Sequence, residues 1–409
     1  VELAEGFPVR PRFLNSLDTE MVRALSSFAT SAAQFLPRDG QPPNVGDTLR
    51  QLDLAETLRR IREEGPDGFY RGETADLIVA EMERGGGIMT LQDLRAYTAA
   101  WRDPIVFAYR GHSVVSMPPS SSGGATMAEI ANILEGYDLG SMPWHGPEMI
   151  HLYAEAWKRA YADRNQYLAD PDFVDMPLDR MTSTEYAAER RAEISQSEAT
   201  PSSEVGPGLE ATAEGEHTTH YSIVDGSGNA VAVTTTINSW YGSKVTVAGA
   251  GFVLNNEMDD FAAKPGTPNQ FGLVQGENNA VGPGKRMLSA MSPSIVVGPS
   301  GQLRMVTGTP GGATIITTVF QTLSNVLDYG MNAVQAVNAP RIHHQHLPDQ
   351  VYFEPAGLEP STVQRLRAMG HTLVERQDVS GDAQVILIED DGTLTAWSDP
   401  RRGGRAVGW

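Results

Sequence analysis

The sequence predicts a layered α+β fold, and two observations lead to this prediction. Helical patterns dominate the first half of the 409-residue chain, whereas strand patterns cluster after residue 217 and have helices on their flanks. Apolar residues make up 40% of the chain and charged residues 20%, so a sizeable core can form and global disorder is disfavoured. We find no internal repeat.

The helices of the first half are predicted from apolar residues at helical spacing and from signals at the helix ends. Pro147 is favourable in the first turn of the clearest helix, and Ser183 and Thr90 are expected N-caps of two others. Alternation around Gly111 predicts a hairpin. The predicted helices span 48–64, 72–87, 90–97, 146–170 and 183–194, and the hairpin spans 105–119.

The second half reads as strands joined by turns, with helices between some of them. Strands are expected at 220–225, 230–238, 251–256, 292–297, 303–308, 383–390 and 393–399. Helices are expected at 314–330 and 360–370, the first of them entered through a Gly-rich turn. Between the two halves, residues 195–216 are polar and poor in large apolar side chains, which predicts a flexible loop.

Composition excludes several classes of function. The net charge of −20 disfavours a surface for nucleic acid or anionic membranes and favours a soluble protein that handles small molecules. The absence of cysteine excludes disulfides, Cys-based zinc sites and a thiol nucleophile. No apolar run approaches a membrane span of roughly 18 residues. The opening VELAEGFPVRPRFL is not a signal peptide and lacks an initiator Met, so we expect a mature or truncated chain.

The stretch HTTHYSIVD, residues 217–225, follows the polar loop and places adjacent hydroxyls between two histidines. A threonine becomes a useful nucleophile when it is the first residue of a chain, because its own α-amine takes the hydroxyl proton. That amine has a pKa of about 7.7–8.0, so part of it is neutral near physiological pH. Such chemistry requires cleavage before Thr218. An edge strand, which Thr and Tyr also favour, explains the same residues.

Three other stretches carry possible chemistry. The glycines of VTGTPGG, between a strand and a helix, leave N–H groups that stabilise an oxyanion, although a plain tight turn uses the same residues. The acids of LNNEMDDF suit a substrate ammonium or a divalent cation, or form a solvated turn. In GPGKRMLSAMSPS, the hydroxyls of Ser289 and Ser292 accompany Lys285 and Arg286, which suit a carboxylate.

Two further stretches are interpreted as structural. His343, His344 and His346 of RIHHQH are too closely spaced in an irregular stretch to present one face to a metal, so we expect structural polar contacts. Residues 118–124, PPSSSGG, lack the Lys-Ser/Thr ending of a phosphate-binding loop.

Taken together, these motifs resemble the γ-glutamyltransferases, also called glutathione hydrolases, of the N-terminal-nucleophile hydrolase superfamily. The resemblance covers essentially the whole chain, and its motifs occur in the family's order: AEAWKRAYADRNQYLADPDF, TTHYSIVD, NNEMDDF, AVGPGKRMLSAMSP, TGTPGG, NAPRIHHQ and SDPRRGGRAVGW. It implies a four-layer αββα sandwich without a cofactor or a metal. Residues 1–217 would be the C-terminal portion of a large subunit whose N-terminal part is missing, with 195–217 as the flexible processing loop. Residues 218–409 would be the small subunit, and both pieces would form one fused unit.

The resemblance also implies roles for individual residues. The precursor would cut itself between His217 and Thr218, and Thr218 would become the nucleophile with Thr236 hydrogen-bonded to it. The substrate would be a γ-glutamyl compound such as glutathione, and the glutamyl group would pass to water or to an amino acid or peptide. The implied set comprises Asn238, Glu257 and Asp260 for the α-amino group, Ser289 for the α-carboxylate, and the N–H groups of Gly311 and Gly312 for the oxyanion. The cleaved pieces would form a heterodimer, and export to the periplasm or the medium is expected by resemblance alone.

The sequence departs from the family in three places. Ala290 stands where a second serine is usual, and Phe271 stands in the lid segment 265–276 where a tyrosine is common. The arginine that pairs the substrate carboxylate has no clear counterpart in residues 1–217. Two alternatives therefore stay open: an amidase acting on cephalosporins or poly-γ-glutamate, and a non-catalytic protein that remains one chain.

Overall fold

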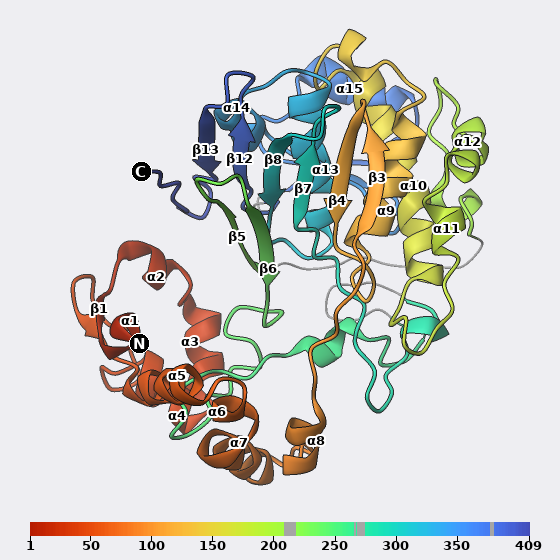
Figure 1. The fold of residues 1–409 in the computed structure, drawn as a ribbon. Coiled ribbons are helices and arrows are strands. Elements are labelled where there is room, and N and C mark those ends of the chain that lie inside the picture. The colour runs from red at the N-terminus through yellow and green to blue at the C-terminus, as the bar shows by residue number, and fades with distance from the viewer. Residues whose placement is uncertain (208–217, 266, 268–274, 377–379) are drawn as a thin grey trace. The chain divides into compact units, whose positions relative to one another are not determined.

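The computed structural model describes residues 1–207, 218–265, 267, 275–376 and 380–409. Two compact units are present (Figure 1). The first comprises Val1–Trp101 and Ile237–Asn256, and the second comprises Arg102–Thr236 and Glu257–Trp409. The predicted cleavage point between residues 217 and 218 falls within the second unit and does not separate the two units. Cleavage at this point stays a prediction.

The first unit is built from short helices around the inserted segment 237–256. Its helices are α1 (Glu2–Glu5), α2 (Pro11–Asn15), α3 (Thr19–Ser26), α4 (Ala29–Phe35), α5 (Leu52–Glu64), α6 (Asp67–Tyr70), α7 (Gly72–Gly85) and α8 (Leu91–Ala96). Strands β1 (Phe7–Pro8) and β2 (Thr48–Leu49) pair antiparallel. The inserted segment contributes Val247 and Ala250 to a buried cluster with Ala75 and Ile78, and this burial is what holds the segment in the unit.

The sequence predicts the end of α7 and the start of α8 well, but it places the start of α5 too early and predicts one strand wrongly. The helix predicted from residue 48 begins at Leu52, because Thr48–Leu49 form strand β2 and pair with β1. Gly86 ends α7 in the left-handed conformation, and Thr90 forms the expected capping box with Asp93. The strand predicted at 251–256 is wrong, because this stretch makes only an isolated bridge between Thr246 and Val253. Gly249 and Gly251 have positive φ angles there, so the chain turns tightly instead of continuing as a strand.

The second unit contains a six-stranded antiparallel sheet in the order β13-β12-β8-β7-β4-β3. The strands are β3 (Ile105–Tyr109), β4 (His112–Ser116), β7 (Ser294–Val297), β8 (Leu303–Gly308), β12 (Gln384–Ile388) and β13 (Leu394–Ser398). The predicted hairpin around Gly111 is confirmed as β3–β4. A smaller sheet joins β9 (Ile342–His343), β10 (Val351–Phe353) and β11 (Leu373–Glu375).

Helices cover one face of the six-stranded sheet, and a hairpin packs on the other. The covering helices are α9 (Gly123–Leu134), α10 (Pro147–Tyr167) and α13 (Thr314–Leu327), and the hairpin is β5 (Thr219–Val224) with β6 (Ala230–Thr235) (Figure 1). Alternation along β8 separates the two faces: Met305 joins the buried cluster of the helices, whereas Gly308 meets His220 of the hairpin. The α+β class and the stacking of helices on sheet on sheet are confirmed.

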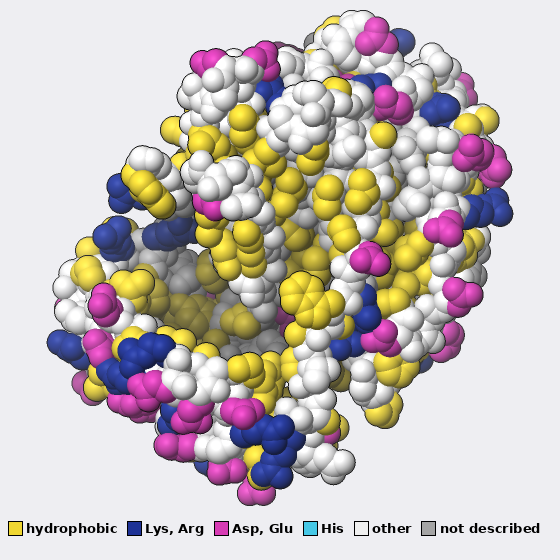
Figure 2. Space-filling model, viewed as in Figure 1, with side chains coloured by type: hydrophobic (Ala, Val, Ile, Leu, Met, Phe, Trp, Pro, Cys, Tyr) yellow, Lys and Arg dark blue, Asp and Glu magenta, His cyan; other side chains and the backbone are white. Residues whose placement is uncertain are grey.

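Shorter elements surround this core. They are α11 (Leu178–Met181), α12 (Thr184–Ala192), α14 (Ala333–Asn338), α15 (Pro360–Ala368) and the 3₁₀ turns η1 (Leu139–Ser141), η2 (Ser202–Glu204), η3 (Glu257–Asp260) and η4 (Glu277–Asn279). Ser183 caps α12 as predicted, accepting from the amide of Tyr186. The outer side of the β5–β6 hairpin is apolar, with Tyr221, Ile223 and Val231 exposed (Figure 2).

Candidate active site

The hairpin register brings the two candidate threonines together. Thr219 pairs with Thr235 in β5–β6, so the next residues outward, Thr218 and Thr236, lie opposite each other where the hairpin opens. The hydroxyl of Thr218 donates to the hydroxyl of Thr236 over 3.3 Å. His217 lies outside the described residues. The geometry therefore provides a hydroxyl pair at the position predicted for the nucleophile.

His220 lies beneath this pair, and its importance is not evident from the sequence. Its side chain points toward the six-stranded sheet, and its ring nitrogens meet the hydroxyls of Thr234 at 2.9 Å and Ser222 at 3.0 Å. Burial lowers the pKa of His220 to about 4, so the ring is neutral near physiological pH. The signal in the sequence is its place two residues after Thr218, on the same side of the strand.

The glycines of the TGTPGG motif form the predicted turn between β8 and α13. Gly311 has φ 141° and Gly312 has φ 56°, both in the region that favours glycine. A Cβ on Gly311 would overlap the Thr314 hydroxyl, which donates to the Gly311 carbonyl over 2.7 Å. Within the described ranges, the amides of Gly311 and Gly312 make no backbone hydrogen bond. The turn thus leaves two N–H groups at the start of a 14-residue helix.

Ser289 lies in a segment that pairs with the loop before α9. Its amide donates to the Ser120 carbonyl over 2.9 Å, and its carbonyl accepts from both the amide and the hydroxyl of Ser122 at 2.7 Å. Ser289 itself is half-buried, whereas Ala290 is 5% exposed and packs in the helix-side core. The residues 118–124, interpreted as structural, thus fix Ser289 in place and end in α9.

The two basic residues near Ser289 have other partners. Lys285 donates to the carbonyls of Asn278 at 2.5 Å and Ala280 at 3.0 Å, so it closes its own loop. Arg286 pairs with Asp172 at 3.0 Å. Because both cations already have partners within the protein, neither is reserved for a substrate carboxylate.

The acidic residues and Asn238 occupy different units. Glu257 and Asp260 lie in the single turn η3 of the second unit, and the Asp260 carbonyl accepts from Asn279 at 2.7 Å. Asn238 belongs to the first unit, where its amide donates to the Asn256 carbonyl over 3.2 Å. Their joint role in substrate binding stays a prediction. The lid segment lies largely outside the described residues, including Phe271.

The histidines of RIHHQH make structural polar contacts, as expected. His343 bonds Thr317 and Gln345 at 2.8 Å each, and His344 bonds Asp349 at 3.2 Å. Burial lowers the pKa of His343 to about 3 and that of His344 to about 4. His346 donates to backbone carbonyls of the segment before residue 207.

The sequence does not predict one buried group of possible metal ligands, because its members lie far apart along the chain. His151, Glu155 and His371 bring possible ligand atoms within 4.8 Å of one another. Glu155, however, already pairs with Lys158 at 3.2 Å and Arg159 at 2.7 Å. The positive charges of Lys158 and Arg159 would repel a metal ion bound here, so we interpret the group as a structural polar cluster.

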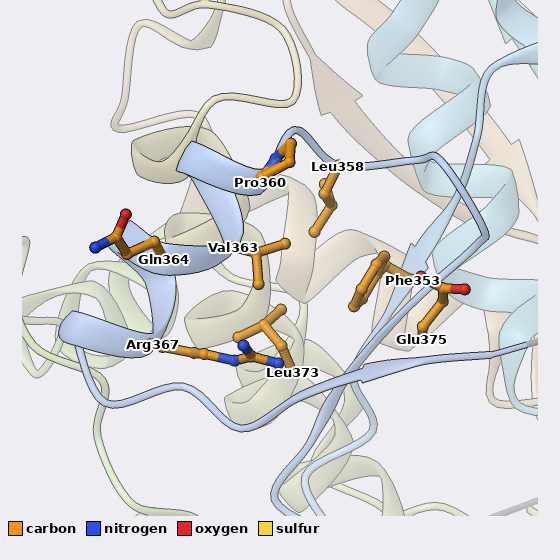
Figure 3. A pocket seen from close by; sticks show the side chains of 8 residues that line it. All are labelled: Phe353, Leu358, Pro360, Val363, Gln364, Arg367, Leu373 and Glu375. Carbon is orange, nitrogen blue, oxygen red and sulfur yellow. The ribbon is translucent and has the colours of Figure 1, made fainter.

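A cavity of about 480 Å³ lies between α15 and the strands β10 and β11 (Figure 3). Apolar side chains including Phe353, Leu358 and Val363 line it, with Arg367 and Glu375 at its sides. It shares no residue with the candidate active site.

A model of the family described as gamma-glutamyltranspeptidase matches residues 1–409. The chain belongs to this family. It is 47% identical over 397 residues to the glutathione hydrolase proenzyme of Escherichia coli strain K12, covering 97% of this chain and 68% of that protein. It is 47% identical over 380 residues to the glutathione hydrolase proenzyme of Pseudomonas sp. strain A14, covering 93% of this chain and 64% of that protein. The chain therefore spans about two thirds of the length of these relatives.

Among solved structures, a cephalosporin acylase from Bacillus halodurans matches with a TM-score of 0.83 and 28% identity, covering 100% of this chain and 73% of that one. The predicted membership of the gamma-glutamyltranspeptidase family is thus confirmed, and so is the fold class. No helix within the described ranges has the length and apolar character to span a membrane.

Proposed function

We propose that this member of the gamma-glutamyltranspeptidase family is a self-processing γ-glutamyl hydrolase and transpeptidase acting on glutathione and related γ-glutamyl amides. The observation that carries the proposal is the 3.3 Å contact between the hydroxyls of Thr218 and Thr236. The names of the relatives, glutathione hydrolase proenzymes at 47% identity, support both the substrate class and the processing step.

Processing begins when the Thr218 hydroxyl attacks the carbonyl carbon of His217. The C–N bond breaks as the C–O bond of an ester forms, and the proton of the hydroxyl passes to the departing nitrogen. Water then hydrolyses the ester, which leaves a carboxylate on His217 and a free α-amine on Thr218. The two pieces remain associated as a heterodimer, because strands from both sides of residue 218 share one sheet.

Turnover uses the new amine of Thr218 as its general base. The hydroxyl attacks the γ-carbonyl of the substrate, and the amides of Gly311 and Gly312 stabilise the oxyanion that develops. The leaving amine takes a proton, and a glutamyl ester remains on Thr218. Water or the amine of an amino acid or peptide then cleaves this ester. Thr236 holds the attacking oxygen in position by a hydrogen bond.

Substrate recognition in this proposal rests on charge complementarity. Glu257 and Asp260, with Asn238, bind the α-ammonium group, and Ser289 binds the α-carboxylate. A γ-glutamyl group carries both charges on one carbon. Export to the periplasm or the medium is part of the same proposal and rests on family resemblance.

An acylase acting on cephalosporins is the second candidate, favoured by the 0.83 TM-score to the Bacillus halodurans enzyme. A glutaryl side chain lacks the α-ammonium group, so the acids of η3 would have no charge to bind. Turnover of γ-glutamyl- and glutaryl-anilides separates the candidates, and faster glutaryl hydrolysis would reject the first one.

Processing is tested by intact mass and N-terminal sequencing of the purified protein. We expect two pieces, the second beginning at Thr218, and we expect Thr218→Ala to remain one chain without turnover. A single wild-type chain with no new N-terminal threonine would favour a non-catalytic protein. Hydrolysis that survives in Thr218→Ala would reject Thr218 as the nucleophile.

A further inference from the structure

The segment that leads from α12 toward Thr218 is held by hydrogen bonds to side chains as far as Gly206. This differs from the flexible loop expected over 195–216, because hydrogen bonds restrain its first part. Lys158 donates to the Thr200 carbonyl, and the Thr200 amide donates to the Glu155 carboxylate at 3.0 Å. The Ser202 amide donates to the Asp349 carboxylate at 2.8 Å, and His346 donates to the Ser202 and Val205 carbonyls at 3.0 Å each. Arg190 donates to the Gly206 carbonyl at 2.6 Å.

The segment completes the hydrogen bonding of side chains that are buried. Glu155 is 0% exposed, Lys158 is 1% exposed and His346 is 2% exposed. A buried charge or imidazole that loses its partners carries a large desolvation cost. The contacts are made to backbone atoms, so they hold the path of the chain rather than particular side chains. The segment is therefore a built-in part of this polar cluster.

The cluster joins regions from both sides of Thr218. Glu155 and Lys158 lie in α10, upstream of the predicted cleavage point, whereas His346 and Asp349 lie downstream. Asp349 connects the two sets, because it pairs with Lys158 at 3.3 Å while accepting from Ser202. Cleavage before Thr218 would leave all these contacts intact.

We propose that Glu155, Lys158, His346 and Asp349 form a tail anchor, a binding surface whose partner is the chain's own segment 200–206. The tail anchor fixes the upstream end of the connection to Thr218 at Thr200, Ser202 and Val205. After cleavage it keeps the end of the upstream piece bound to the downstream piece. The positioning role rests on the proposed self-cleavage, whereas the binding role does not.

Asp349→Ala is the test variant, because the Asp349 side chain is 41% exposed and Lys158 keeps its ion pair with Glu155 at 3.2 Å when Asp349 is removed. Glu359→Ala is the matched control, a surface carboxylate at the start of α15 away from the segment. Hydrogen-exchange mass spectrometry is first run on Thr218→Ala chains, which remain uncleaved. We expect Asp349→Ala to raise the exchange rate of the Ser202 amide, which donates to Asp349, at least about tenfold, and Glu359→Ala to leave it unchanged.

The second measurement is self-cleavage of chains that retain Thr218. We expect Asp349→Ala to slow the appearance of the two pieces about tenfold, with unchanged turnover per cleaved molecule. Unchanged amide exchange would overturn the tail anchor, and faster exchange with a wild-type cleavage rate would overturn its positioning role. If the wild-type chain never cleaves, the proposed function fails, while the exchange measurement still decides whether the segment is held.

Discussion

The imidazole of His220 lies directly against the backbone of Gly308, where β5 packs on β8. Both ring nitrogens bond hydroxyls of the hairpin, so the ring cannot move aside without losing those bonds. A side chain at position 308 would occupy the space of the ring. Glycine at this point of β8 therefore sets how closely the hairpin that carries Thr218 approaches the six-stranded sheet.

Gly308→Ala is expected to destabilise the protein by about 1–3 kcal/mol, because the added methyl group overlaps a ring that is fixed on both sides. Urea unfolding measures this loss. Gly226→Ala serves as the control, since a Cβ at Gly226, in the turn of the same hairpin, meets no atom within 4 Å. Equal stability of the two variants would contradict the close packing of His220 on Gly308.

Thr236→Ala is expected to lower kcat about two- to tenfold, because the hydroxyl of Thr218 loses its partner at 3.3 Å. Thr236→Ser retains the hydroxyl and should recover most of the activity. Thr235→Ala is the matched control, since this exposed neighbour lies on the other side of β6. A Thr236→Ala enzyme with full kcat would show that the contact does not assist the reaction.

Local residue types predicted the Gly311–Gly312 turn, because glycine tolerates positive φ angles. The pairing of Thr218 with Thr236 was implied by the family resemblance, and the hairpin register of the structure explains it. The strand proposed at 251–256 failed because glycines allowed a tight turn inside an apolar stretch. Apolar composition alone does not separate a strand from a buried turn.

Contacts across long sequence distances could not be predicted in this way. His151 and His371 bond each other at 2.8 Å although 220 residues separate them. The restraint on segment 200–206 likewise comes from side chains that no local pattern links to it. Such contacts depend on how helices and loops pack, which periodicity does not specify.

Glu129→Gln is expected to change how stability depends on pH. Burial, together with the charge of Asp163, raises the pKa of Glu129 well above its usual range. An acid with a raised folded pKa stabilises the protein fully below its unfolded pKa of about 4.3, and this contribution is lost as pH rises toward the folded value. Glutamine cannot ionise, so the variant should gain stability relative to wild type as pH rises.

Urea unfolding from pH 4 upward measures this difference. Glu148→Gln is the control, because Glu148 is exposed on α10 and has no ion pair within the described ranges. A constant difference between Glu129→Gln and wild type at every pH would mean that Glu129 ionises normally in the folded protein.

Asp399→Asn is expected to cost about 3 kcal/mol or more of folding stability. Asp399 is fully buried and pairs with Arg341, which is 3% exposed, and with Arg401 at 3.2 Å. Removal of one charge from a buried pair leaves the other without compensation, and that cost exceeds the worth of the pair itself. Asp390→Asn is the control, because Asp390 is exposed and lies 3.8 Å from Arg304, where an ion pair contributes about 0–1 kcal/mol. Similar small losses for both variants in urea unfolding would contradict this prediction and show that the buried pair of Asp399 and Arg341 contributes little to folding stability.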